Sequence, residues 1–239
     1  MLGRFLEVSV HAPNALESLE FYQRLGFSSA EVGETWTHPY GVVTDGRLAI
    51  GLHQYEFASP SLTFVKPDLF RHLAEFEALG IDFEFRKLGD NVFNEAGFRD
   101  PDGTMITLIE ARTFSPPARD PGEVSMCGYF TEFGIPSRDP DHSKAFWEQF
   151  GFIAVEEHAE PFRRISLTSD FLDVGLFETG DIKRPVLTFV DPEMPARIAR
   201  ILKSGIEPSP RLPRSFDAES TALFIAPEGT PLLLITGDL

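Results

Sequence analysis

The sequence predicts an α+β protein built from tandem modules of one strand, one helix and three further strands, with four modules in all. Two observations predict this fold class. Segments of the first half recur in the second half at an almost constant spacing, and each recurring unit switches between strand and helix periodicity. A segment rich in proline and polar residues separates the halves. We therefore expect domains at residues 1–112 and 125–239, joined by a linker at 113–124.

Four segments of the first half have counterparts in the second. FYQRLGF at residue 21 recurs as FWEQFGF at residue 146, and SLTFVKPD at residue 61 recurs as VLTFVDPE at residue 186, both 125 positions on. LAIGLHQYE at residue 48 has its counterpart in LDVGLFETG at residue 172, and DPDGTMITL at residue 100 in APEGTPLLL at residue 226. One order and a near-constant offset indicate a duplicated domain.

The first module begins with a strand and a helix. RFLEVSVH alternates with a period of two, which places Val8 on the opposite face from Glu7 and Ser9. NALESLEFYQRLGF then has helical spacing, with Asn14 as the expected N-cap and Gly26 as the expected C-terminal stop. This strand and this helix therefore open the first half.

The remaining elements repeat this cycle. Two or three strands end in RLAIGLHQY, after which SLTFV and DLFRHLAEFEALG supply the next strand and helix, and further strands close the half. In the second half, Asp139 and Pro140 are the expected N-cap and first helical residue of DPDHSKAFWEQFGF. Each half is thus expected to hold two modules.

Composition and charge exclude several classes of function. The formal net charge is −16, which argues against nucleic-acid binding because neutralising phosphates requires a basic face. No apolar run is long enough to cross a bilayer, and the N-terminal residues have no signal-peptide pattern. The single cysteine, Cys127, rules out an intramolecular disulfide. We expect a cytoplasmic protein with neither a nucleic-acid nor a membrane partner.

The order of elements, the FYQRLGF helix end and the closing segment DPDGTMITLIE resemble the vicinal-oxygen-chelate superfamily. This superfamily includes glyoxalases, bleomycin-resistance proteins and extradiol dioxygenases, and the resemblance covers nearly the whole chain. It implies two glyoxalase-like domains with cupped mixed sheets. In metal-dependent members, side chains from four strands hold a divalent metal in the cup, but the fold alone does not fix the reaction.

The resemblance also locates the positions at which metal-dependent members carry their ligands. In the first cup these are Glu7, Gly51, Ser61 and Thr107. In the second cup they are Glu132, Gly175, Val186 and Leu233. A transition-metal site normally takes at least three side chains from His, Cys, Asp and Glu. We therefore expect no metal ligands and no cofactor, with an unusual divalent-metal site as the alternative.

The first cup keeps groups that can do acid–base chemistry. Glu7 and His53 are the predicted catalytic residues, because both should face the cup and together combine a carboxylate with an imidazole. The predicted ligand-binding residues are Ser9, Trp36, Tyr40, Tyr55, Thr63, Met105, Thr107 and Glu132. His38 belongs to the aromatic run around Trp36 and Tyr40, which would form either a wall of the pocket or part of the core.

Two functions remain open at this point. The first is a protein that binds a small organic molecule in the cup without the usual metal site, as in the bleomycin-resistance branch. The second is an enzyme of lyase, isomerase or dioxygenase type that uses an unusual metal site or Glu7 and His53 as acid and base. The partner is a small-molecule ligand in both cases. The sequence leaves open whether the halves pair within one chain or across a homodimer.

Overall fold

The computed structural model describes residues 1–30, 38–90, 92–111 and 125–238. The described part of the first half holds two helices, α1 (Ala15–Arg24) and α2 (Leu69–Ala78). Its strands are β1 (Arg4–His11), β2 (Ser28–Ala30), β3 (Tyr40–Thr44), β4 (Ala49–His53), β5 (Ser61–Val65), β6 (Phe83–Lys87), β7 (Glu95–Arg99) and β8 (Met105–Ile109).

The described part of the second half also holds two helices, α3 (Pro140–Glu148) and α4 (Met194–Lys203). Its strands are β9 (Tyr129–Pro136), β10 (Ile153–His158), β11 (Arg164–Thr168), β12 (Val174–Phe177), β13 (Val186–Asp191), β14 (Thr221–Ile225) and β15 (Pro231–Thr236). None of the helices in the described ranges is long and apolar enough to cross a membrane.

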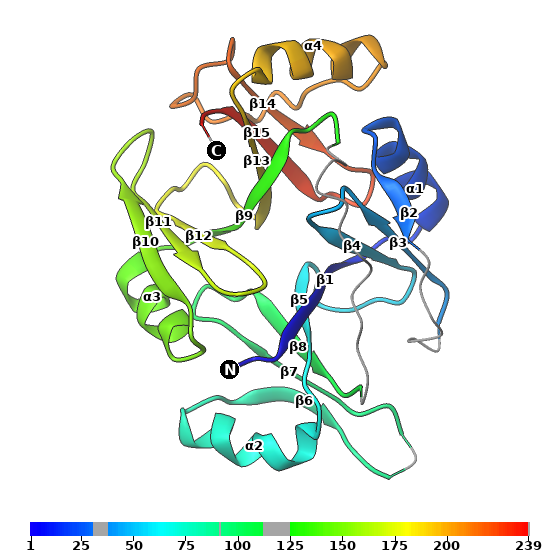
Figure 1. Cartoon of the computed structure of the whole chain (residues 1–239), viewed down its shortest axis with the longest axis vertical. Helices are drawn as coiled ribbons and strands as arrows, with labels where there is room; N and C mark the ends of the chain where they lie inside the picture. Colours follow the sequence, from blue (N-terminus) through cyan, green and yellow to red (C-terminus); the bar gives the residue numbers. More distant parts are fainter. Residues whose placement is uncertain (31–37, 91, 112–124, 239) are drawn as a thin grey trace.

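Each half forms its own mixed sheet (Figure 1). The first sheet has the strand order β2-β3-β4-β1-β5-β8-β7-β6, and the second has β10-β11-β12-β9-β13-β15-β14. The two modules of a half meet where their first strands pair antiparallel, β1 with β5 and β9 with β13. The predicted α+β fold with mixed sheets is confirmed.

The predicted helix ends are also present. The side chain of Asn14 accepts a hydrogen bond from the backbone of Glu17, and that of Asp139 accepts one from the backbone of His142. Gly26 has a φ of 88°, a left-handed conformation that glycine adopts without strain at the end of a helix.

The fourth module departs from the prediction, because only two strands follow α4 among the described residues. The segment that would correspond to β6 carries Pro208, Pro210 and Pro213. Proline has no backbone N–H to donate to a ladder and is poorly tolerated inside a sheet. The second sheet therefore ends at β14, and among residues 125–238 there is no counterpart to the outer strand β6.

The two halves share one hydrophobic core. The rings of Phe76 and Phe150 stack with centroids 5.9 Å apart, and those of Phe27 and Phe189 meet edge to face at 6.3 Å. Both pairs join residues from different halves, so the modules pack against each other within one chain. The proposed domain boundary at 113–124 lies outside the described residues and stays a prediction.

Candidate functional site

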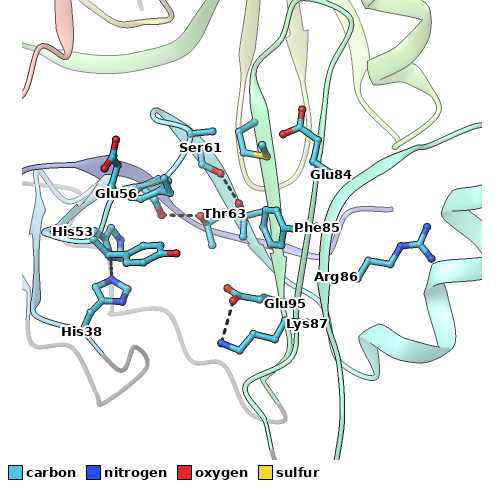
Figure 2. Close-up of a pocket in the computed structure, with 16 residues that line it drawn as sticks. His38, His53, Glu56, Ser61, Thr63, Glu84, Phe85, Arg86, Lys87 and Glu95 are labelled. Carbon is cyan, nitrogen blue, oxygen red and sulfur yellow. Dashed lines mark hydrogen bonds and ion pairs between the residues drawn. The ribbon is translucent and has the colours of Figure 1, made fainter.

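A cavity of about 480 Å³ opens on the first sheet, and we call it the first cup (Figure 2). Its floor comes from β1, β4, β5 and β8, and β6 and β7 supply the facing wall. Its lining residues are Ser9, His38, His53, Tyr55, Glu56, Phe57, Ala58, Ser61, Thr63, Glu84, Phe85, Arg86, Lys87, Glu95, Met105 and Thr107.

A chain of hydrogen bonds links a buried carboxylate to two imidazoles of this cavity. Oε1 of Glu7 lies 2.8 Å from Nε2 of His53, and Nδ1 of His53 lies 2.9 Å from Nε2 of His38. Glu7 and His53 are both 2% exposed, while His38 is partly exposed. The chain therefore runs from the protein interior to the wall of the cavity.

Backbone pairing places these groups together. β1 runs parallel to β4, which sets His53 beside the end of β1, and Tyr40 of β3 pairs with His53 from the other side. The Glu7 carboxylate occupies the space above Gly51, where an added Cβ would lie 2.2 Å from Oε1. Glycine at position 51 is thus what allows the carboxylate to reach across to His53.

The hydrogen-bond chain sets the tautomers of both histidines. An ionised Glu7 only accepts, so Nε2 of His53 carries the proton and donates it to Oε1. Nδ1 of neutral His53 then accepts from Nε2–H of His38. Partial burial and the neighbouring His53 lower the pKa of His38 below 6.5, which favours its neutral form at physiological pH.

Four hydroxyl groups cover the floor of the cavity. Ser9 Oγ donates to Glu7 Oε1 at 2.8 Å and lies 2.7 Å from Thr63 Oγ1. Ser61 Oγ and Thr107 Oγ1 form a second pair, also at 2.7 Å. All four side chains are buried, and all four line the cavity.

The facing wall is amphipathic. The ring of Phe85 covers Gly97 of the neighbouring strand, where an added Cβ would lie 2.1 Å from a ring carbon. Lys87 Nζ lies 3.3 Å from Oε1 of Glu95 in an ion pair at the edge of the cavity (Figure 2). The wall thus offers an aromatic surface flanked by paired charges.

The second sheet has lost these groups at the equivalent positions. Phe177 stands where the first half has His53, and Gly134 stands where it has Ser9. The ring of Phe177 fills the space above both Gly134 and Gly175. A second hydrophobic cluster, formed by Phe177, Ile182, Val186, Leu223 and Leu233, occupies much of this cup. A smaller cavity of about 210 Å³ remains beside Phe177 and Arg164.

Glu132 consequently has different partners from Glu7. Its Oε2 accepts from Ser166 at 2.9 Å, and Arg164 approaches Oε1 at 3.5 Å without completing a hydrogen bond. Burial raises the pKa of Glu132, and the guanidinium of Arg164 opposes that shift only in part. Oγ1 of Thr188, on the paired strand, is likewise buried without a hydrogen bond.

The structure brings most of the predicted site residues to one place. Glu7 lies beneath the cavity, and Tyr40 stacks on His53 with ring centroids 5.4 Å apart. The predicted residues that line the cavity are Ser9, His53, Tyr55, Thr63, Met105 and Thr107. Glu132 lies in the other sheet, away from this group, and Trp36 lies outside the described residues.

Sequence reasoning missed the facing wall. Phe85, Lys87 and Glu95 of that wall line the cavity but were not among the predicted residues, and neither was Phe57 from the segment between β4 and β5. The alternation of FEFRK on β6 is a signal for a strand with one inward face, yet it does not say which cavity that face lines.

No family model matches the chain, and no curated protein matches it in sequence. Solved structures do match in fold. A variant of homoprotocatechuate 2,3-dioxygenase from Brevibacterium fuscum in complex with HPCA has a TM-score of 0.65 at 17% identity, covering 99% of this chain and 72% of that one. Native homoprotocatechuate 2,3-dioxygenase from Arthrobacter globiformis has a TM-score of 0.64 at 17% identity, covering 99% and 80%. The chain therefore shares its fold with these solved dioxygenase structures, as the resemblance implied.

The comparison corrects the expectation that no cofactor is involved. The solved structures with this fold are extradiol dioxygenases, which are metal-dependent, so the expectation of no cofactor is not supported. The residues at the expected ligand positions do not fit one: Gly51 has no side chain, and the hydroxyls of Ser61 and Thr107 bind each other. Within the described ranges, no three His, Cys, Asp or Glu side chains converge as a metal site.

Proposed function

We propose that the protein binds a small organic molecule in the first cup and moves a proton to or from it through Glu7, His53 and His38. The observation that carries this proposal is the hydrogen-bonded chain from the buried carboxylate to the cavity wall. Hydrogen bonding to Glu7 stabilises positive charge on the imidazoles, as in other carboxylate–histidine pairs that act as general bases. The surrounding apolar surface would exclude water from the bound molecule.

The proton path follows from the tautomers. A ligand C–H or O–H proton that enters the relay at the His38 imidazole, which lines the cavity, would make that ring cationic. His38 could then pass its Nε2 proton to Nδ1 of His53, and His53 could share its Nε2 proton with Glu7. The relay thus spreads the positive charge toward a buried carboxylate, which is the electrostatic role that Glu7 would play.

Binding without chemistry is the second candidate, because the same cup with Phe57, Phe85 and Met105 would also hold a ligand that is only sequestered. Ligand-detected NMR screening in D2O separates the two. A bound molecule that exchanges a C–H proton for deuterium with the wild type supports proton transfer. Binding without exchange for every ligand found would leave sequestration as the function.

His53→Phe is the sharpest variant for this experiment, because phenylalanine is the residue that the second half carries at the equivalent position. It removes both ring nitrogens while keeping an aromatic ring against Tyr40. We expect deuterium exchange to stop while apolar contacts to the ligand persist. Unchanged exchange in a folded His53→Phe protein would contradict the proposed relay.

A further inference from the structure

The protons on the floor of the first cup can be counted. Ser9 has one hydroxyl proton and donates it to Glu7 Oε1. The contact between Ser9 and Thr63 therefore requires Thr63 to be the donor. Thr63 has then used its only proton, so its oxygen can only accept a hydrogen bond from a molecule in the cavity.

The second hydroxyl pair leaves one proton for a ligand. Either Ser61 donates to Thr107 or the reverse, and in both cases one of the two protons is consumed. Across the floor, three of the four hydroxyl protons are committed within the protein, while every oxygen keeps at least one lone pair. The floor thus offers more acceptors than donors.

The charges around the cavity also disfavour an anionic ligand. The carboxylates of its lining belong to Glu56, Glu84 and Glu95, and its cations belong to Arg86 and Lys87. Lys87 is paired with Glu95 at 3.3 Å, and Arg86 is paired with Glu77 at 2.6 Å. An anionic ligand would therefore have to compete with existing ion pairs for both of these cations, inside a chain whose formal net charge is −16.

We infer that the ligand of the first cup is a neutral or cationic organic molecule that presents O–H or N–H donors to Thr63 and its neighbouring hydroxyls. Its apolar part packs against Phe57, Phe85 and Met105. Carboxylates and phosphates are disfavoured as ligands. Oγ1 of Thr63 could only accept a hydrogen bond, so an anion bound there would face a buried acceptor that gives it no proton. This inference rests on the proposed function only in taking the first cup as the binding site.

Matched probes of similar shape test the inference: benzylamine, benzyl alcohol and benzoate. Affinities would be measured by titration followed by protein-detected NMR, so that shifted resonances also report where each probe binds. We expect benzylamine and benzyl alcohol to bind in the first cup about tenfold more tightly than benzoate, the effect of roughly one hydrogen bond.

Ser9→Ala provides a readout that a merely structural residue would not give. Without Ser9, the Thr63 proton loses its acceptor and becomes available to a ligand. The preference for donor probes should shrink, with benzoate gaining affinity while benzylamine loses it. A uniform loss for all probes would contradict the proton count.

The remaining outcomes are distinct. Tighter binding of benzoate in the first cup, or no binding of the donor probes up to their solubility limit, overturns the inference about ligand class. Donor probes that bind elsewhere, with no shifts from residues of the first cup, overturn both this inference and the proposed site. If benzylamine and benzyl alcohol bind in the first cup and no bound ligand exchanges a C–H proton for deuterium, the ligand class is supported and the proposed relay is contradicted.

Discussion

Ser18 of α1 donates a hydrogen bond to Glu228 of the other half at 2.7 Å, and its repeat equivalent makes the mirrored contact. Ser143 of α3, 125 positions later, donates to Asp102 of the first half at 2.5 Å. Each acidic residue lies in the tight turn before the last strand of its half. The duplicated sequence has thus produced a pair of related contacts that join the halves.

Removal of Glu228 should weaken the junction between the halves. Glu228 accepts hydrogen bonds from both Ser18 and Tyr22, the second at 2.8 Å. Glu228→Ala would leave two buried hydroxyls without an acceptor, so we expect a loss of about 2–4 kcal/mol in the free energy of unfolding. Urea denaturation at constant m-value measures this loss.

Glu20→Ala is the matched control, because Glu20 is an exposed carboxylate on the same helix as Ser18. It should change stability by less than about 0.5 kcal/mol. Equal midpoints for the two variants would show that the Glu228 contacts contribute nothing to the folded state.

Local patterns in the sequence predict the elements but not the cross-half contacts. The repeat aligns Ser18 with Ser143, and the caps at Asn14 and Asp139 follow from neighbouring residues alone. Ser18 and Glu228 are 210 positions apart, so their contact depends on how two finished sheets pack. The prolines in the segment after α4 indicate locally that no strand forms there, but a search for repeated strands overlooks them.

The candidate site likewise has contacts that the sequence predicts and contacts that it does not. Alternation along β1 and β4 places Glu7 and His53 on one face, and their contact follows once β1 pairs with β4. Nε2 of His38 hydrogen-bonds to His53. No sequence periodicity predicts this bond, because His38 precedes β3 and belongs to no helix or strand. Phe85 and Lys87 enter only because β6 curls over the cavity.

Gly51→Ala should disrupt the first cup. The new methyl group would lie 2.2 Å from Glu7 Oε1, so the carboxylate must move away from His53. We expect a loss of about 1–3 kcal/mol in stability, as for other overpacked sites, together with loss of ligand binding. Thermal unfolding and probe titration measure the two effects.

Gly41→Ala supplies the comparison for this substitution. Gly41 lies in β3, next to β4, and an added Cβ there would meet nothing within 4 Å. The variant should keep both stability and binding. A Gly51→Ala protein that behaves like Gly41→Ala would mean that Glu7 does not need its observed position.

Asp100 should make stability fall as pH rises. Burial raises the pKa of Asp100 from 3.8 to about 7, against the opposing backbone hydrogen bond from Thr104. The folded state therefore binds more protons than the unfolded state between these values. Stability from this group is fully present below pH 3.8 and is lost as the pH rises through about 7.

Asp100→Asn tests this dependence, because asparagine stays neutral and Oδ2 of Asp100 is buried without a hydrogen bond. Relative to the wild type, the variant should gain stability between about pH 5 and about pH 8.5, by at most about 3 kcal/mol. Urea titrations at both pH values give the difference. Asp82→Asn, at an exposed position, should show no such gain, and a pH-independent difference for Asp100→Asn would refute the assignment.

Glu7→Gln and Glu132→Gln form the decisive pair for the site, because the two carboxylates are repeat equivalents with different surroundings. Glutamine keeps the size of Glu7 but removes the charge that His53 and Ser9 point toward. Charge-assisted hydrogen bonds are about twice as strong as neutral ones, so ligand binding or turnover should fall at least about tenfold, or about 1.4 kcal/mol. Isothermal titration with a ligand found by screening measures the loss.

Glu132→Gln should do much less, because Phe177 and its neighbours leave only a small cavity of about 210 Å³ in the second cup and Oε1 of Glu132 already lacks a hydrogen bond. Equal losses from the two substitutions would mean that both sheets contribute to one function. No loss from Glu7→Gln, in a protein that circular dichroism shows to be folded, would mean that the carboxylate is a remnant of the duplication. In that case the hydrogen-bonded chain to His38 would serve only to hold the cavity wall in place.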